Sequence, residues 1–230
     1  MPKNIIISGA NGGLGTVVVK KFLDAGYTVI AIDRSGKRPG YIGSDAPYEA
    51  YSVNLANEQE ISDFVQEAIR KYKKIDGALM LAGGFAMGDI AATDSDALKK
   101  MMTLNFDTAY FLARPLFQHM MQNGYGRLVF IGSRPALQPG DGKSKLAYSL
   151  SKSLLFTLSD MLNAEAKGKN VVSSVVVPST IDTPGNRAAM PKADFEKWVK
   201  PEAIADVLEF ICSEKGDAVR EAVYKLYHFA

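Results

Sequence analysis

Two side chains that can move a proton, Tyr148 and Lys152, lie four residues apart in the stretch Tyr-Ser-Leu-Ser-Lys. On a helix this spacing places both side chains on one face. A phenol is a poor acid or base near neutrality because its reference pKa is about 10, but a nearby ammonium favours the phenolate. The pair is therefore a candidate acid/base device. Tyr-x-x-x-Lys also occurs on ordinary solvated helix faces, so its interpretation depends on the surrounding sequence.

The elements that would hold this pair alternate along the chain. Short apolar runs predict strands at residues 5–8, 28–33, 51–55, 77–82, 127–133, 171–178 and, less strongly marked, 223–227. Between them, apolar residues recur at helical spacing. The predicted helices begin near Leu14, after a cap at Asn57, at Thr93 or Asp94, near Ala147 and at Pro201. This alternation predicts an α/β fold, a single doubly wound domain of residues 1–230 with a mainly parallel sheet and helices on both faces.

A glycine-rich turn follows the first predicted strand directly. Residues 8–15 read Ser-Gly-Ala-Asn-Gly-Gly-Leu-Gly. Glycines here let the turn close and let backbone amides at a helix N-terminus approach a pyrophosphate. An ordinary glycine-rich connection is the alternative. We predict a dinucleotide site that includes Gly9, Asn11, Gly12, Gly13, Leu14 and Gly15.

The end of the second predicted strand bears on which dinucleotide binds. Asp33 stands where a carboxylate can accept hydrogen bonds from an adenosine ribose and repel a 2′-phosphate. This position favours NAD(H). Arg34, a further predicted cofactor contact, is followed by Lys37 and Arg38, and these cations can attract such a phosphate. NADP(H) therefore stays open as the alternative.

The order of the polar residues resembles a known family. Asn105, Ser133, Tyr148 and Lys152 are similar in order and context to the catalytic tetrad of the short-chain dehydrogenase/reductase family, and the glycine spacing of residues 9–15 resembles the motif of that family. The resemblance spans nearly the whole chain. It implies an NAD(P)-dependent oxidoreductase that transfers a hydride between nicotinamide and a small carbonyl or alcohol.

The same resemblance implies a role for each member of the tetrad. Tyr148 would exchange a proton with the substrate oxygen, and Lys152 would lower the pKa of Tyr148 and hold the ribose. Ser133 would orient the substrate oxygen and Asn105 would support a water relay. A turn or cap role for Ser133 and a packing role for Asn105 are the alternatives.

Further cofactor contacts are implied after the third, fourth and sixth predicted strands. They are Asn54, Leu55, Ala82, Gly83, Gly84, Pro178, Thr180 and Thr183. Thr183 is the candidate partner of the nicotinamide carboxamide, with a plain loop as the alternative. Two asparagines that most family members carry before the Ala-Gly pair are absent here.

Two segments, 81–86 and 181–198, look more like one branch of the family, the NADH-dependent quinonoid dihydropteridine reductases, which also lack the paired asparagines. That branch lacks the catalytic serine, whereas this chain has Ser133, so both carbonyl reduction and pterin reduction stay open. A non-catalytic nucleotide-sensing protein is a third possibility, but such a protein would normally have lost Tyr148 or Lys152.

A substrate pocket is predicted from apolar residues in two segments of the chain. Phe85, Met190 and Trp198 are its candidate wall, and residues 184–198 are a candidate lid that excludes water. For Phe195 and Trp198, core packing is an equally good interpretation.

Composition narrows the partners and the compartment. Among 230 residues, 27 are basic and 25 acidic, and they are spread along the chain, which indicates neither a nucleic-acid nor a membrane partner. One cysteine and two histidines leave no expected disulfide or metal site. The N-terminal apolar run is too short for a signal peptide and no run approaches a transmembrane helix, so we expect a cytoplasmic protein with a small-molecule substrate.

Self-association is also expected, by resemblance to the family. The helices predicted around residues 97–121 and 147–167 carry more apolar residues than one sheet face needs. Pairing of these helices across a two-fold axis predicts a homodimer or a homotetramer.

Overall fold

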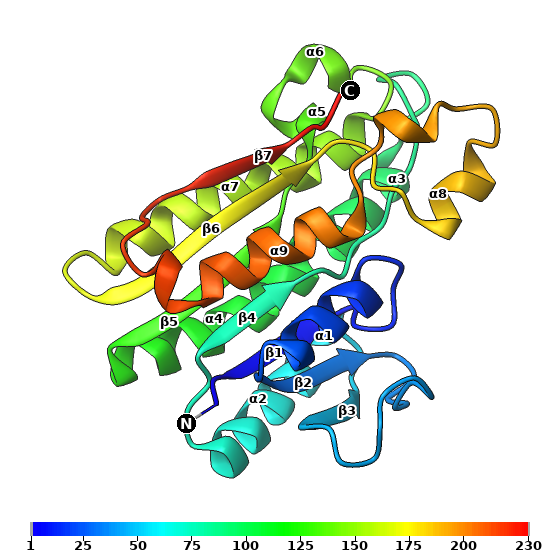
Figure 1. Cartoon of the computed structure of the whole chain (residues 1–230). Helices are drawn as coiled ribbons and strands as arrows, with labels where there is room; N and C mark the ends of the chain where they lie inside the picture. Colours follow the sequence, from blue (N-terminus) through cyan, green and yellow to red (C-terminus); the bar gives the residue numbers. More distant parts are fainter. Residues whose placement is uncertain (1, 230) are drawn as a thin grey trace.

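Seven parallel strands form one sheet with helices packed on both faces, in a computed structural model that describes residues 2–229 (Figure 1). The strands lie in the order β3-β2-β1-β4-β5-β6-β7. The strand order therefore reverses direction between β1 and β4, which is where doubly wound sheets bind their ligands. The predicted fold class is confirmed.

The strands are β1 (Asn4–Ser8), β2 (Thr28–Asp33), β3 (Tyr48–Ser52), β4 (Gly77–Met80), β5 (Tyr125–Ile131), β6 (Asn170–Pro178) and β7 (Val223–Leu226). Six of them end within two residues of their predicted bounds. The prediction for β3 at residues 51–55 was wrong. The chain turns away from the sheet at Asn54. The side-chain oxygen of Asn54 accepts a hydrogen bond from the Ala56 backbone amide at 3.2 Å, and the backbone amide of Asn54 donates to the Glu60 carboxylate at 3.0 Å.

Alternating residues of the strands build a separate core on each face of the sheet. Ile5 and Ile7 of β1 pack under α1 (Gly15–Asp24) and α9 (Pro201–Cys212). Ile6, between them, packs under α2 (Glu58–Tyr72), α4 (Thr108–Asn123) and α7 (Leu146–Glu165). Because both faces are covered, the central strands are apolar throughout, as the sequence predicts.

Two predicted helix starts are confirmed. The Asn57 side chain accepts hydrogen bonds from the amides of Gln59 and Glu60 at the N-terminus of α2, and Pro201 occupies the first turn of α9. The long helix expected from residue 94 to 121 is three consecutive segments: α3 (Ser95–Met102), a π-helical segment (Thr103–Asp107) and α4. Asp94 caps the first of them.

Several short helices surround the carboxyl edge of the sheet. They are α5 (Arg134–Leu137), α6 (Pro139–Gly142) and α8 (Pro184–Ala189), with a 3-10 turn at Phe195–Lys197. A second 3-10 turn, Glu214–Gly216, follows α9 at the opposite, amino edge. None of the helices in residues 2–229 has the length and apolar character that crossing a bilayer requires.

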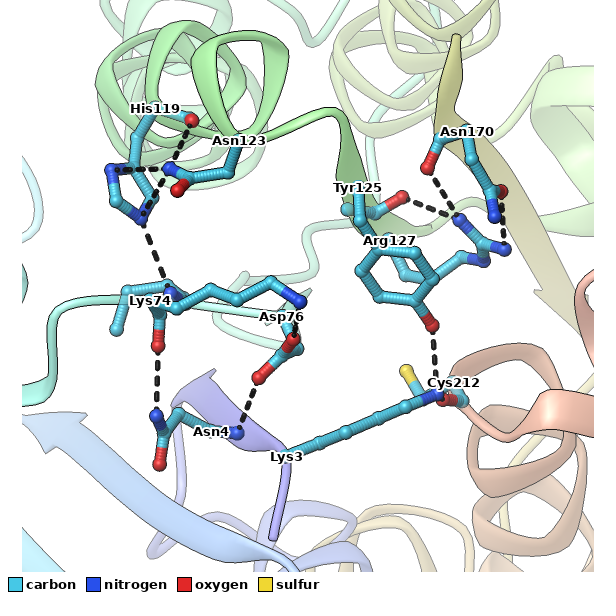
Figure 2. A network of polar contacts seen from close by, with 12 residues as sticks. Lys3, Asn4, Lys74, Asp76, His119, Asn123, Tyr125, Arg127, Asn170 and Cys212 are labelled. Atoms are coloured by element: carbon cyan, nitrogen blue, oxygen red, sulfur yellow. Dashed lines mark hydrogen bonds and ion pairs between the residues drawn. The ribbon is translucent and has the colours of Figure 1, made fainter. Parts of the chain in front are cut away.

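A polar network joins the amino ends of the strands, at the opposite edge (Figure 2). The buried Arg127 guanidinium donates to Asp217 at 2.7 Å and to the side chain of Asn170 at 2.8 Å. The Lys3 ammonium donates to the Tyr125 hydroxyl at 2.7 Å. These bonds connect the starts of β1, β5 and β6 to the loop that precedes β7, so this edge is a structural anchor.

Candidate active site

The Tyr148 phenol lies at the carboxyl edge of the sheet, in the first turn of α7. It is half-buried, and its ring meets the edge of the Phe85 ring at a centroid distance of 5.0 Å and an interplanar angle of 71°. Burial raises the pKa of Tyr148, and the neighbouring Ser133 hydroxyl partly opposes that rise. The structure thus brings Ser133, Tyr148 and Phe85 together.

The Ser133 hydroxyl is available to a ligand. Ser133 is 3% exposed, and its oxygen forms no hydrogen bond of normal geometry within residues 2–229. Buried hydroxyls are nearly always paired, so an unpaired one beside a phenol points to a group that binds there. A substrate oxygen at this position would receive a hydrogen bond from Ser133.

Lys152 is buried one helical turn after Tyr148. Its ammonium donates to the Ile131 carbonyl oxygen at 2.8 Å, and burial lowers the pKa of Lys152 to about 8. We expected Lys152 to lower the pKa of Tyr148. In this arrangement the pKa of Tyr148 is raised by burial, Ser133 is the group that opposes the rise, and the effect of Lys152 stays a prediction.

Asn105 connects the loop after β4 to α7. It is fully buried in the π-helical segment, where its side-chain oxygen accepts from the Gly84 amide at 2.9 Å and its amide donates to the Ser151 hydroxyl at 3.0 Å. π-helical turns are frequent at functional sites. Both ends of the Asn105 carboxamide are thus used to hold the site together, and its role in a water relay stays a prediction.

Gly83 leaves the space in which these groups meet. A Cβ atom on Gly83 would lie 2.7 Å from the Asn105 side-chain oxygen and 3.3 Å from the Lys152 ammonium nitrogen. Any side chain there would displace the buried carboxamide. The residue type at position 83 is therefore set by the approach of Asn105 and Lys152.

The glycine turn has the geometry of a nucleotide cradle. Gly9 has a φ of +67°, and a Cβ atom on Gly15 would lie 2.1 Å from the Gly9 carbonyl oxygen, so neither position accepts a side chain. Leu14 precedes α1 without a side-chain cap, and the amides of Thr16 and Val17 in the first turn donate to the Gly12 and Leu14 carbonyl oxygens at 3.0 and 3.2 Å. The glycine turn thus leads directly into a helix N-terminus, whose dipole favours an anion.

A cavity of about 340 Å³ opens beside this turn. It is lined by Gly9, Asn11, Gly12, Asp33, Arg34, Ser35, Leu81, Ala82 and Gly83. Seven of these nine residues are predicted cofactor contacts, and the backbone and carboxylate groups they offer fit the adenosine half of a dinucleotide.

The charged residues after β2 are not equivalent. Asp33 directs one carboxylate oxygen, Oδ1, to the backbone amides of Ser35 and Gly36 at 2.6 and 2.9 Å. Arg38 donates to the carbonyl oxygens of Tyr48 at 2.8 Å and Ala46 at 3.2 Å, and thereby holds the loop before β3. Its guanidinium is directed into that loop, whereas Arg34 remains an exposed wall of the cavity.

Asn54 and Leu55 lie apart from the residues that line the cavity. The Asn54 side chain caps the turn after β3, and Leu55 packs against the core formed by α2 and α4. Contact between these two residues and an adenine stays a prediction.

The segment after β6 packs onto the glycine turn. A Cβ atom on Gly13 would lie 3.0 Å from the Cβ atom of Thr183, and the Thr183 hydroxyl accepts from the Asn186 amide at 3.2 Å as the cap of α8. Pro178 ends β6, and the Thr180 carbonyl oxygen accepts from Val199 at 2.9 Å. Thr183 thus lies at the glycine turn, with its hydroxyl already used in a cap.

The predicted substrate residues differ in exposure. Phe85 and Met190 are 58% and 41% exposed, whereas Trp198 is 6% exposed and packs on Phe195 at a centroid distance of 4.8 Å. The packing interpretation therefore describes Trp198 in this structure. Phe85 is the predicted wall residue that contacts Tyr148.

Three residues were missed by the sequence interpretation: Ser151, and Ser35 and Leu81 in the wall of the cavity. Ser151 lies inside the Tyr-Ser-Leu-Ser-Lys stretch and accepts from Asn105, and Ser35 lines the cavity and donates to Asp33 at 2.7 Å. The pattern Asp-x-Ser-Gly after a strand is typical of a side-chain-capped turn and is the signal that indicates Ser35. No group of three potential metal ligands occurs within the described part of the chain.

A family model and individual relatives both match this chain over most of its length. A family model described as short chain dehydrogenase matches residues 3–194. A dihydropteridine reductase of Dictyostelium discoideum is 27% identical over 211 residues, which cover 90% of this chain and 87% of that protein. A 3-oxoacyl-[acyl-carrier-protein] reductase FabG of Thermotoga maritima is 22% identical over 230 residues, with coverages of 94% and 93%.

Solved structures share the fold. ElxO with NADP bound has a TM-score of 0.90 at 20% identity, with coverages of 98% and 97%. A 4-hydroxyisoleucine dehydrogenase complexed with NADH has a TM-score of 0.86 at 23% identity, again with coverages of 98% and 97%. The nicotinamide cofactors in these two structures differ.

Proposed function

The chain belongs to the short-chain dehydrogenase/reductase family and is an NAD(P)-dependent oxidoreductase, and from this premise we propose that Tyr148 is the general acid/base of hydride transfer to or from a small carbonyl or alcohol. The observation that carries the proposal is the half-buried Tyr148 phenol beside the buried, unpaired Ser133 hydroxyl. Two oxygen donors at one point can bind the oxygen of a polarised carbonyl.

The chain's own residues perform the proton chemistry. A bound nicotinamide supplies or accepts the hydride. During reduction Tyr148 gives its phenol proton to the substrate oxygen, and Ser133 donates a hydrogen bond to the same oxygen. In the opposite direction the Tyr148 phenolate accepts the proton. Lys152 supplies positive charge one turn away, and we assign a ribose hydroxyl to its ammonium.

The cofactor contacts follow the cavity. We assign the pyrophosphate to the amides of the glycine turn and the ribose of the adenosine to Asp33. NADH is the preferred form in this proposal, because Asp33 places a negative charge in the cavity while Arg38 is directed to backbone carbonyls. The exposed Arg34 is the residue that would favour NADPH instead.

Pterin reduction is a second candidate. It is favoured by the likeness of segments 81–86 and 181–198 to dihydropteridine reductases and by the 27% identity to the Dictyostelium discoideum protein. The exposed Phe85 ring next to Tyr148 offers an aromatic wall against which a planar heterocycle can pack. A nucleotide-sensing protein without turnover is the alternative of another class.

The experiment follows consumption of NADH and NADPH separately against quinonoid dihydropterin, quinones and simple carbonyls. On the best substrate, Tyr148→Phe should lower kcat by at least about 100-fold, because the proton donor is lost. NADH binding, followed by fluorescence titration, should change little. The matched control is Tyr110→Phe, which removes a hydroxyl from a ring on α4 that stacks on Phe106.

Wild-type turnover of any substrate excludes the nucleotide-sensing alternative. Retained turnover in Tyr148→Phe would contradict the assignment of the acid/base. A preference for dihydropterin with NADH would identify the pterin branch despite Ser133.

We further propose that the protein is a cytoplasmic homodimer or homotetramer with residues 184–198 as a substrate lid. The support for association is a stripe of exposed apolar side chains on α7, formed by Leu150, Leu154 and Met161. The support for the lid is the packing of Thr183 on the glycine turn and the exposure of Met190.

A further inference from the structure

The Ser35 hydroxyl is at the centre of the turn that follows β2. It donates to Asp33 Oδ1 at 2.7 Å and accepts from the Asn11 side-chain amide and the Lys37 backbone amide, both at 3.2 Å. No other side chain in residues 2–229 hydrogen-bonds to Asp33. One hydroxyl therefore connects the acidic residue to the glycine turn.

These bonds leave the Asp33 carboxylate with one free oxygen. Oδ1 accepts from the Ser35 amide, the Ser35 hydroxyl and the Gly36 amide at 2.6, 2.7 and 2.9 Å, which saturates it. Asp33 Oδ2 has no hydrogen bond within the described residues, and Asp33 lines the cavity. Because the three donors occupy Oδ1, Oδ2 is the oxygen of Asp33 that remains to accept a hydrogen bond from a ribose hydroxyl.

The turn itself rests on β3. Gly36 has a φ of +58°, and a Cβ atom there would lie 2.7 Å from the Ser52 amide nitrogen. The Ser52 hydroxyl donates to the Arg34 carbonyl oxygen at 3.1 Å. The backbone of residues 33–36 is therefore held against β3. The Asp33 side chain is oriented by two backbone amides of this turn and by the Ser35 hydroxyl, the one side-chain donor to it in residues 2–229.

Orientation of Asp33 matters because cations lie next to it. Arg34 and Lys37 are exposed on the same turn, so an Asp33 carboxylate that has lost the Ser35 hydroxyl, and is held by two backbone amides alone, can shift toward either of them. That movement would withdraw negative charge from the cavity and leave room for a 2′-phosphate. We propose that Ser35 is a positioning residue that selects NADH over NADPH by holding Asp33 in the cavity. The proposal rests on the NADH preference proposed above.

The test measures dissociation constants of NADH and NADPH by fluorescence titration at fixed ionic strength, because the 2′-phosphate makes binding salt-dependent. Ser35→Ala should lower the ratio of the NADPH to the NADH constant by about tenfold, since a hydrogen bond to a charged group is lost. Ser52→Ala is the matched control, because it removes from β3 a hydroxyl that bonds to the same turn at Arg34 and not to Asp33.

An isosteric pair separates the hydroxyl from the fold. Ser35→Thr keeps the donor and should keep the wild-type ratio, whereas Ser35→Val has the same shape and should behave as Ser35→Ala. If the wild type binds NADPH more tightly than NADH, the cofactor preference in the proposed function is wrong. If the wild type prefers NADH and both Ser35→Ala and Ser35→Val match Ser52→Ala, the role of Ser35 is overturned.

Discussion

At the scale of single residues, the buried ammonium of Lys152 lowers the folding stability of the protein. Burial lowers the pKa of the Lys152 ammonium from 10.5 to about 8, so at pH 7 the folded protein holds a charge that water would solvate better. Its single recorded partner in residues 2–229 is the Ile131 carbonyl oxygen. A group required for chemistry is here kept at a cost in folding free energy.

We therefore expect Lys152→Met to be more stable and inactive. Removing the buried charge should raise the free energy of unfolding at pH 7 by about 2 kcal/mol, after allowance for the lost hydrogen bond to Ile131. For a chain of this size that corresponds to a rise in Tm of roughly 4–8 °C. Lys100→Met, on the exposed face of α3, is the control and should leave Tm unchanged.

The pH dependence gives the sign of this effect. Between about pH 8 and 10.5 the unfolded chain binds more protons at Lys152 than the folded protein does, so wild-type stability gains from this group as pH rises. The Tm advantage of Lys152→Met should thus shrink from pH 7 to pH 10. An advantage that is constant with pH would show that packing, and not charge, is responsible.

At the scale of elements, most strands and the doubly wound parallel sheet could be predicted because apolar runs separated by helical periods leave few topologies. β3 was predicted three residues too late, because its sequence Tyr-Glu-Ala-Tyr-Ser has no continuous apolar run and the strand ends before the turn that the hydrogen bonds of Asn54 begin. The π-helical segment is invisible to periodicity. It depends on Asn105 bonding to Gly84 and Ser151, which lie 21 and 46 residues away in the chain.

The candidate site likewise has features that could be predicted from local sequence and features that could not. Tyr148, Ser133 and the glycine turn could be predicted because each has a local signature. The proximity of Thr183 to Gly13, the withdrawal of Arg38 into a loop and the burial of Trp198 depend on packing between segments far apart in the sequence.

The segment that contains the predicted lid is held at its two ends by ion pairs and backbone hydrogen bonds. Asp182 is 6% exposed in its side chain and pairs with Arg187 at 2.5 Å and Lys200 at 2.7 Å. These cations hold the pKa of the Asp182 carboxyl well below its usual range. Residues 180–182 also hydrogen-bond to Val199, so both ends of the segment are joined.

Asp182→Asn should loosen this segment. The neutral side chain loses its attraction for Arg187 and Lys200, so trypsin should cut after Lys192 and Lys197 several-fold faster than in the wild type, and the substrate KM should rise. Mass spectrometry of the fragments measures the cleavage. Asp194→Asn, which breaks an exposed pair with Lys197 at 3.7 Å, is the control and should change the rate little. Equal rates in wild type and Asp182→Asn would contradict the role of Asp182 as a fastening.

At the scale of the whole molecule, the two edges of the sheet have different tasks. The amino edge is closed by the network around Arg127 and Lys3, in which charged groups are paired with one another or with backbone (Figure 2). The carboxyl edge carries the cavity, the unpaired Ser133 hydroxyl and the short helices. Rigid support at one edge and open polar groups at the other agree with ligand binding at the strand ends.

The outer face of α7 carries exposed apolar side chains that bear on the predicted self-association. Leu150, Leu154 and Met161 are 44%, 38% and 65% exposed on this helix, which also carries Tyr148 and Lys152. Their spacing places them near one another on a face that the described residues leave uncovered. A second copy that packs α7 against α7 across a two-fold axis would cover this stripe and stiffen the helix of the acid/base pair.

We expect the wild type to sediment as a dimer or tetramer at micromolar concentration, and Leu154→Glu/Met161→Glu to raise the dissociation constant at least about tenfold, because two carboxylates would be buried against apolar side chains. Analytical ultracentrifugation measures both. Ile90→Glu, at a residue that is 79% exposed in the loop after β4, is the control and should leave assembly unchanged. A monomeric wild type, or a double variant that assembles as the wild type does, would exclude α7 as the interface. Since α7 carries Tyr148, the dissociated variant should also show a lower kcat than Ile90→Glu at equal cofactor saturation.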